Sequence, residues 1–253
     1  RLYHSGAVEE TLKEAMQNKT SIQGISHTIY ARIINDRCTL SIDTSGDPLY
    51  KRGYKIMTPE APLRENICAM ILNQFKLNDF SSIIDPMCGG GTFTLEACSL
   101  LGHISPFAEN RFFAFQNFPV YSVKTFMDIK RRLSVEKSRT DFFAFDLNDD
   151  SVKLSRQNFS NAGLSEIINS DKNDFFSLQR NNFPDGNILI VLNPPYGKRI
   201  ESDDSMFSRI CSKLKNDFSD ASFAVVLPDN ESDIFTERFD CKRIMFSNGG
   251  IKV

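Results

Sequence analysis

The chain has 253 residues, of which 41% are hydrophobic and 25% charged, and its formal net charge is −2. These values are ordinary for a globular domain and exclude a uniformly basic nucleic-acid binder, although a local basic patch stays compatible with them. No run approaches the roughly 20 apolar residues of a membrane span, and no charged start followed by an apolar core suggests a signal peptide, so we expect no membrane partner. The six cysteines form no Cys-x-x-Cys pair, which favours a reducing cytoplasm over zinc or disulfide chemistry.

The first 50 residues predict a small α+β unit. Residues 8–16 place their apolar side chains on one face of a short amphipathic helix. Two strand-like runs follow at 27–34 and 38–43, and the Asn35-Asp36 pair between them is a good hairpin signal. The Gly-, Pro- and Asp-rich stretch 43–55 is typical of a linker. We therefore place a boundary near residue 50, which gives domains 1–50 and 51–253.

After this boundary, strand and helix patterns alternate. Apolar strands are expected at 81–85, 142–146, 187–192, 222–227 and 242–246. Helices are expected at 61–75, 92–101, 149–163 and 204–218. Apolar strands that are each followed by a helix are typical of a parallel sheet covered on both faces. One more strand could begin at the final GGIKV, so we expect this edge of the sheet to be cut short.

The first candidate site is the stretch IIDPMCGGGTF, residues 83–93. In parallel sheets, ligands bind at the carboxyl ends of the strands, and here three glycines follow a strand and precede a helix. Glycine allows a sharp turn and a close approach of a ligand to the backbone. The spacing is not that of a Walker loop, and Asp85 before the glycines suits a cationic ligand better than a pyrophosphate. The alternative is a tight turn without a ligand.

Acidic residues end the next two strand-like segments. Asp146 ends the strand 142–146, where a carboxylate can hydrogen-bond both hydroxyls of a ribose. The alternative is that the acidic and amide side chains after this strand only cap the following helix. Asp174 follows a third strand-like segment and could reach an adenine amino group, and Asp171 competes for that role.

The motif NPPY, residues 193–196, ends the strand 187–192. Pro194 and Pro195 have no N–H, so the strand cannot continue in a hydrogen-bonded ladder. The carbonyls of Asn193 and Pro194 and the Asn193 amide oxygen can then accept hydrogen bonds, and Tyr196 offers a flat face for stacking. This combination suits a planar exocyclic amine, whereas a generic Asn-Pro turn is the alternative. No cysteine lies beside the motif to attack a base, and Cys88 is expected to be a small buried residue.

The residues quoted above resemble a known family. DPMCGGGTF followed by NPPYGKRI resembles the S-adenosylmethionine-dependent amino-methyltransferases of the Rossmann-like class. With RLYHSG, SIDTSGDPLYKRGY, APLREN and FAFQNFP, the chain is similar to the THUMP-associated RNA guanine-N2 methyltransferases over nearly its whole length. The resemblance implies a class I α/β fold with a mostly parallel seven-stranded sheet. It also implies that residues 1–50 are the C-terminal part of a THUMP RNA-binding domain, and that a chain beginning at Arg1 is a fragment.

The resemblance also implies a role for each matching position. The methionine part of the cofactor would contact Asp85, Pro86, Cys88, Gly89 and Gly91. The ribose would contact Asp146, the adenine Asp174, and the target amine Asn193, Pro194, Pro195 and Tyr196, with Asn193 also lining the cofactor site. Family members commonly have serine where this chain has Gly90.

We therefore expect a cytoplasmic enzyme that methylates the N2 amine of a guanine in RNA. The cofactor would be S-adenosylmethionine, with S-adenosylhomocysteine as product, and no metal is expected because the three histidines do not cluster. The partner would be RNA, with rRNA favoured over tRNA, and the basic stretch 124–139 could contact its phosphates. The alternatives are a DNA adenine-N6 methyltransferase and a non-catalytic RNA-binding module with a degenerate methylase fold.

Overall fold

The chain folds into two compact units. The structure, a computed structural model, describes residues 5–16, 27–55, 63–105, 111–132, 137–195, 205–248 and 251–253. The first unit comprises Arg1–Leu49 and Asn110–Leu133, and the second comprises Tyr50–Glu109 and Ser134–Val253. The predicted second domain, 51–253, includes the segment 110–133, which the structure groups with the first unit.

The first unit contains a helix, α1 (Ser5–Met16), and an antiparallel hairpin of β1 (Ile29–Ile34) and β2 (Arg37–Ile42). The turn residues Asn35 and Asp36 have φ values of 49° and 60°. A two-residue hairpin turn needs this left-handed conformation at both positions, and Asn and Asp tolerate it well. The predicted hairpin and its turn are confirmed.

Aromatic packing explains why the segment 111–132 belongs to the first unit. The N–H of Phe115 donates to the carbonyl of Thr44 at 3.1 Å, and the His27 and Phe118 rings meet edge to face at 4.6 Å. Four aromatic rings within the segment pack on one another, those of Phe113, Phe115, Tyr121 and Phe126. The segment ends in α4 (Val123–Arg132), whose last turn carries three basic residues.

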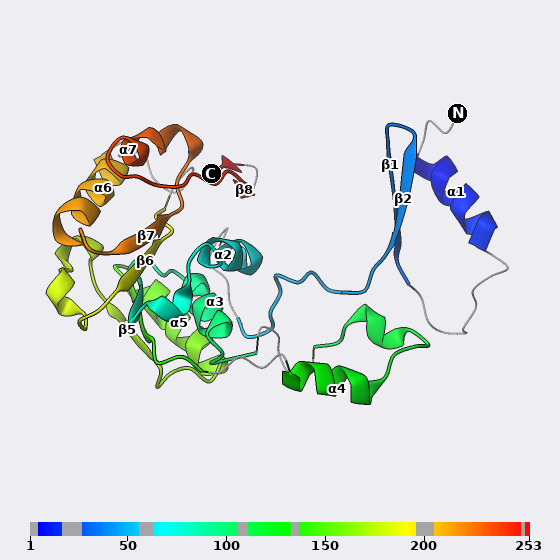
Figure 1. Cartoon of the computed structure of the whole chain (residues 1–253), viewed down its shortest axis with the longest axis horizontal. Coiled ribbons are helices and arrows are strands. Elements are labelled where there is room, and N and C mark those ends of the chain that lie inside the picture. Colours follow the sequence, from blue (N-terminus) through cyan, green and yellow to red (C-terminus); the bar gives the residue numbers. More distant parts are fainter. Residues whose placement is uncertain are drawn as a thin grey trace. The chain divides into compact units, whose positions relative to one another are not determined.

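The second unit is built on a five-stranded parallel sheet (Figure 1). Its strands are β3 (Ser82–Asp85), β4 (Asp141–Asp146), β5 (Ile168–Lys172), β6 (Ile188–Leu192) and β7 (Ser222–Val225), in the order β5-β4-β3-β6-β7. The predicted α/β class with a parallel sheet is confirmed. Within the described residues the sheet has five strands, not the seven that the resemblance implied.

The predicted strand at 242–246 is wrong. This segment runs past β7 without forming a strand, and only β8 (Ser247–Asn248) and β9 (Ile251–Lys252) pair beyond it, as a short antiparallel ladder. Its last residue, Phe246, exchanges two backbone hydrogen bonds with Val253 and so continues the β8–β9 ladder instead of pairing with β7. Lys242 hydrogen-bonds Gln74 at 2.8 Å, and Arg243 forms an ion pair with Asp229, so both residues bind other elements.

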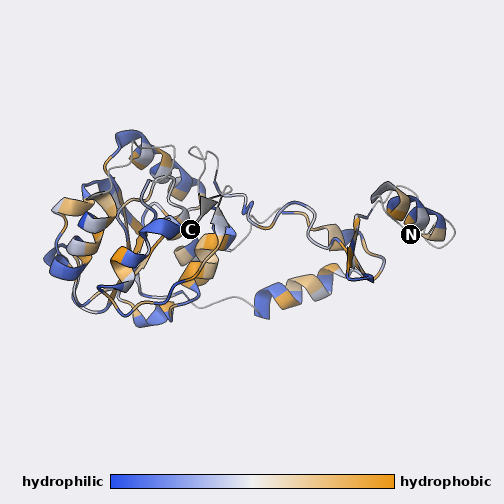
Figure 2. Ribbon diagram, turned by 90° about the horizontal axis from the view of Figure 1, so that it is seen from above, coloured by the Kyte–Doolittle hydropathy of each residue, from blue (hydrophilic) through white to orange (hydrophobic). Residues whose placement is uncertain are grey.

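Helices cover both faces of the sheet. One face packs against α2 (Glu65–Leu72), α3 (Thr92–Leu100) and α5 (Asp149–Asn161), and the other against α6 (Ser205–Asp217) and α7 (Asp233–Thr236). Successive strand residues alternate between the two cores, because side chains of a strand point to opposite faces: Ile83 lies in the first core and Ile84 in the second. The flanking helices carry both hydrophobic and hydrophilic residues (Figure 2).

Short 3₁₀ turns connect several of these elements, at Leu77–Asp79, Ala114–Asn117, Phe175–Ser177, Arg180–Asn182 and Asp229–Glu231. α2 is shorter than the predicted helix 61–75, and the start of that prediction falls on residues outside the described ranges. α5 begins after Asn148, whose side chain accepts hydrogen bonds from two backbone N–H groups. Among the helices described, none is long and apolar enough to cross a membrane.

The strand order creates a switch point between β3 and β6. From the central β3 the chain adds β4 and β5 on one side, and it then crosses over to add β6 and β7 on the other. Helix α3, which follows β3, and helix α6, which follows β6, accordingly pack on opposite faces of the sheet. In sheets of this type, ligands bind in the crevice that opens at this point.

Candidate active site

Two of the predicted site residues flank the switch point. Asp85 is the last residue of β3, and Asn193 follows the last residue of β6. In the β3–β6 register Ile84 pairs with Ile190, so Asn193 lies two residues, roughly 7 Å, further along the strand direction than Asp85. The predicted glycine-rich stretch and the NPPY motif thus leave neighbouring strands at the same edge of the sheet.

The glycine loop, residues 86–91, is tied to the end of the neighbouring strand β4. The Cys88 N–H donates to the Phe145 carbonyl at 2.8 Å, and the Gly89 N–H donates to Asp146 Oδ2 at 2.9 Å. Gly89 and Gly91 have φ values of 52° and 77°, a conformation that residues with a Cβ rarely adopt. The two glycines that the resemblance selected are therefore the two whose backbone requires glycine.

Helix α5 supports the same loop from behind. The buried Asn158 side chain donates to the Gly90 carbonyl at 3.0 Å. A Cβ on Gly91 would lie 2.4 Å from Cε1 of Phe159, whereas a Cβ on Gly89 would meet nothing within 4 Å. Gly91 is thus packed against the protein, and Gly89 borders open space. The sequence analysis missed Asn158 and Phe159, although both lie in the predicted helix 149–163.

Asp85 is a buried carboxyl with one unused oxygen. Its Oδ2 accepts a hydrogen bond from Thr94 Oγ1 at 3.1 Å, and its Oδ1 finds no hydrogen-bond partner among the described residues. Burial raises the pKa of Asp85 to about 7; the Thr94 hydrogen bond opposes this shift and the charge of Asp146 adds to it. A cationic group placed at Oδ1 would stabilise the carboxylate. The sequence analysis found Asp85 but missed Thr94, whose hydroxyl faces it from the first turn of α3.

Asn193 provides a second unused acceptor. Its Oδ1 is buried and has no hydrogen-bond partner in the part of the chain that the structure describes. Buried polar atoms of native proteins nearly always have a partner, so such an atom indicates where a ligand donor would lie. Pro194 is buried and Pro195 exposed, whereas Tyr196 lies outside the described residues.

Asp146 and the two aspartates after β5 make different contacts. Asp146 accepts the N–H groups of Gly89 and Asn148, both at 2.9 Å, and a carboxylate retains acceptor capacity beyond two such bonds. Asp171 is exposed and forms an ion pair with Arg156 at 3.1 Å. Asp174 accepts the N–H of Phe176 at 3.0 Å and follows Asn173, whose N–H donates to the Asp146 carbonyl. Both aspartates thus lie beside the end of β4, Asp171 opposite Phe145 in the β4–β5 ladder and Asp174 just beyond it, but Asp171 also pairs with an arginine.

Pro86 and Cys88 are buried parts of the glycine loop. Burial raises the pKa of the Cys88 thiol well above its ordinary value, and the Asp85 and Asp146 carboxylates add to this effect. The thiol therefore stays protonated near neutral pH and is a poor nucleophile. This agrees with the expected role of Cys88 as a small packed side chain.

The residues at the switch point fit a nucleoside cofactor that carries a positive charge. The free Asp85 oxygen can accept an ammonium group, the open space beside Gly89 allows close approach, and Asp146 and Asp174 stand at the next two strand ends. Within the described ranges, no group of three or more His, Cys, Asp or Glu side chains could hold a metal ion.

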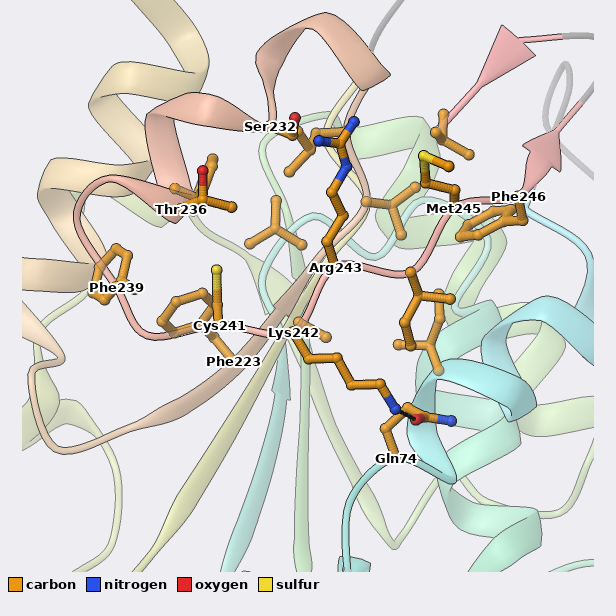
Figure 3. Close-up of a pocket in the computed structure, with 18 of the residues that line it drawn as sticks. Gln74, Phe223, Ser232, Thr236, Phe239, Cys241, Lys242, Arg243, Met245 and Phe246 are labelled. Atoms are coloured by element: carbon orange, nitrogen blue, oxygen red, sulfur yellow. Dashed lines mark hydrogen bonds between the residues drawn. The ribbon is translucent and has the colours of Figure 1, made fainter.

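A separate groove of about 550 Å³ runs along β7 (Figure 3). Its lining comes from α2, β7, α7 and the segment 241–246, and Figure 3 shows Lys242 extending towards Gln74. None of the predicted site residues that the structure describes lines this groove. Its walls are largely aromatic and aliphatic, including Phe223, Phe235 and Phe239.

The chain is similar in sequence to known methyltransferases. The profile of the family described as UPF0020, RMKL-like methyltransferase domain, matches residues 52–249. Two relatives are ribosomal RNA large subunit methyltransferases K/L. The protein of Vibrio parahaemolyticus is 27% identical over 213 residues, and that of Photobacterium profundum is 29% identical over 212. Each alignment covers 80% of this chain but only 30% of the relative, so the chain spans less than a third of their length.

Solved structures resemble the chain over nearly its whole length. One is a putative methyltransferase, SMU.472, complexed with SAH. It matches this chain with a TM-score of 0.78 and 25% identity, and the match covers 97% of this chain and 66% of SMU.472. A possible methylase from Clostridium difficile 630 has a TM-score of 0.77 and 27% identity, with coverage of 98% and 66%. TrmN from Thermus thermophilus, at a TM-score of 0.64 and 16% identity, shares the fold.

Proposed function

Because the chain belongs to the RMKL-like methyltransferase domain family, we propose that it transfers a methyl group from S-adenosylmethionine to the N2 amine of a guanine in ribosomal RNA. One observation carries the proposal: two buried acceptors that have no hydrogen-bond partner among the described residues, Asp85 Oδ1 and Asn193 Oδ1, flank the switch point of the sheet. One acceptor suits the ammonium group of the cofactor, and the other suits the amine that is methylated.

The cofactor would lie across the ends of three strands. Asp85 and the glycine loop would hold its methionine part, Asp146 its ribose, and Asp174 its adenine. The relative SMU.472 was solved with SAH, which supports this cofactor. When bound, the cofactor supplies an electrophilic methyl group. Asp171 is the weaker candidate for the adenine because Arg156 already holds its carboxylate.

Asn193 and the prolines after it would hold the target amine. The Asn193 side-chain oxygen and the Pro194 carbonyl can each accept one N–H of an exocyclic amine. The amine becomes positively charged as it is methylated, so oxygens placed there stabilise the developing charge. The amine would lose one proton to water once it has accepted the methyl group, so the proposed site needs no strong base. Tyr196 would stack on the base plane.

RNA is the proposed substrate on two grounds. The two K/L relatives are named for ribosomal RNA, although the chain spans 30% of their length. The last turn of α4 carries Lys130, Arg131 and Arg132, and such clusters track phosphates. We further propose that residues 1–50 derive from a THUMP domain, and that the basic turn of α4 contributes to RNA contact.

Nucleoside analysis by mass spectrometry tests the proposal. Large-subunit rRNA from cells that lack the gene should lose N2-methylguanosine, and the gene with Asn193→Ala should not restore it. Unchanged N2-methylguanosine in rRNA, together with loss of the same nucleoside from tRNA, would move the substrate to tRNA. Loss of N6-methyladenine from DNA would favour the DNA methylase alternative and refute the RNA assignment.

A further inference from the structure

Residues 52–55 form a buried ionic contact with α3, the helix that follows the glycine loop. We name residues 52–55 the strap. The Arg52 guanidinium donates to both carboxylate oxygens of Glu96, at 3.0 and 2.9 Å, and the Tyr54 hydroxyl donates to the same carboxylate at 2.5 Å. Only 12% of the Arg52 side chain and 2% of the Glu96 side chain are exposed. This is a bidentate pair shielded from water, unlike an ordinary surface ion pair.

A second buried pair lies at the other end of the strap. Lys55 Nζ binds Glu65 of α2 at 2.9 Å and Thr92 Oγ1 at 3.0 Å, with 6% of the lysine side chain exposed. Thr92 is the first residue of α3, and Glu96 follows it by four positions on the same helix face. The strap therefore contacts α3 twice, once at its first residue and once a turn later.

These contacts reach the glycine loop through two routes. Gly91 is the N-cap of α3, and its carbonyl accepts the Leu95 N–H at 3.0 Å, so the loop moves with the start of the helix. Asn161 in the last turn of α5 donates to the Tyr54 carbonyl at 2.5 Å, and one turn earlier Asn158 donates to the Gly90 carbonyl. The strap is thus linked to Gly91 through α3 and to Gly90 through the end of α5.

We propose that Arg52, Tyr54 and Lys55 are positioning residues that fix the glycine loop, through α3 and α5, in the geometry that binds the cofactor. The inference rests on the proposed function, because the ligand of the loop is taken to be S-adenosylmethionine or its product. None of the three side chains needs to touch the ligand. Their effect is indirect, since a small displacement of a binding loop weakens the contacts of every group on it.

The test measures the affinity for S-adenosylhomocysteine by calorimetry, at a temperature at which circular dichroism shows each variant to be folded. Arg52→Gln should raise Kd about tenfold or more, because it removes both bonds to Glu96 and lets α3 shift. Tyr54→Phe, which removes one hydroxyl and preserves folding, should raise it about two- to fivefold. The double variant R52Q/E96Q leaves no unpaired buried charge and should show the tenfold loss even if R52Q alone does not fold.

Arg180→Gln is the matched control. Arg180 binds Asp220 at 3.0 Å and the carbonyls of Pro184 and Gly186, just before β6 begins and so at the opposite end of the strands from the glycine loop. This variant should lower the unfolding temperature and leave Kd within twofold of the wild type. If the folded Arg52, double and Tyr54 variants also bind with unchanged Kd, their role is structural only and the inference fails. If the wild type binds no S-adenosylhomocysteine, the proposed function fails instead.

Discussion

The ionisation of Asp85 should control cofactor affinity near neutral pH. Its pKa of about 7 in the free protein results mainly from burial, so at pH 6 only about a tenth of the molecules carry the carboxylate. A ligand ammonium prefers the ionised form. Affinity should therefore rise as pH increases through the pKa and level off above it, and Kd for S-adenosylhomocysteine should fall about tenfold between pH 6 and pH 8.

Calorimetry across this pH range checks the prediction, and two variants make it specific. Asp85→Asn should bind weakly with a Kd that no longer changes between pH 6 and pH 8. Thr94→Val removes the hydrogen bond to Oδ2 that lowers the pKa, so the midpoint of the pH dependence should move upwards. A wild-type Kd that is flat over the range, or an unchanged slope in Asp85→Asn, would refute the assignment of Asp85 to the cofactor ammonium.

Three substitutions test the rest of the site. Gly91→Ala should lower the free energy of unfolding by about 2–5 kcal/mol in urea titrations, because it adds the strain of a left-handed residue to a clash with Phe159. Gly89→Ala meets no clash and should lower this free energy by only about 1–2 kcal/mol, so equal losses would contradict the packing argument. Asn193→Ala should reduce the rate of methyl transfer about a hundredfold while Kd for S-adenosylhomocysteine changes less than threefold, and full turnover would exclude an acceptor role. Asp146→Ala should weaken cofactor binding about tenfold, since it removes both the proposed ribose contact and the bond to the Gly89 N–H; an unaltered Kd would remove Asp146 from the site.

Local sequence signals were sufficient for most of the second unit. The strands that begin with Ser82 and Ile188 contain apolar runs, and a proline follows each strand within two residues, so both could be predicted from composition to within one residue. The Asn35-Asp36 turn could also be predicted, because few residues tolerate its backbone conformation. Asp85, Asp146 and Asn193 were selected because each directly ends or follows such a strand.

Contacts between distant parts of the chain could not be predicted from the sequence. The pairing of Arg52 with Glu96 spans 44 positions, and nothing in either local pattern selects its partner. The same holds for the rings that attach 111–132 to the first unit. The segment 242–246 has the composition of a strand, but its last residue, Phe246, pairs with Val253 and not with the sheet, and periodicity does not encode such a choice of partner.

The many attachments of the glycine loop have a thermodynamic consequence for whatever binds there. Its backbone is already held by Phe145, Asp146 and Asn158 before any ligand arrives, so binding need not freeze a mobile segment. A preorganised loop of this kind loses little conformational entropy when the ligand binds, so more of the free energy of its contacts contributes to affinity. Residues around the glycine loop can then change, and with them the substrate, while the loop itself stays the same.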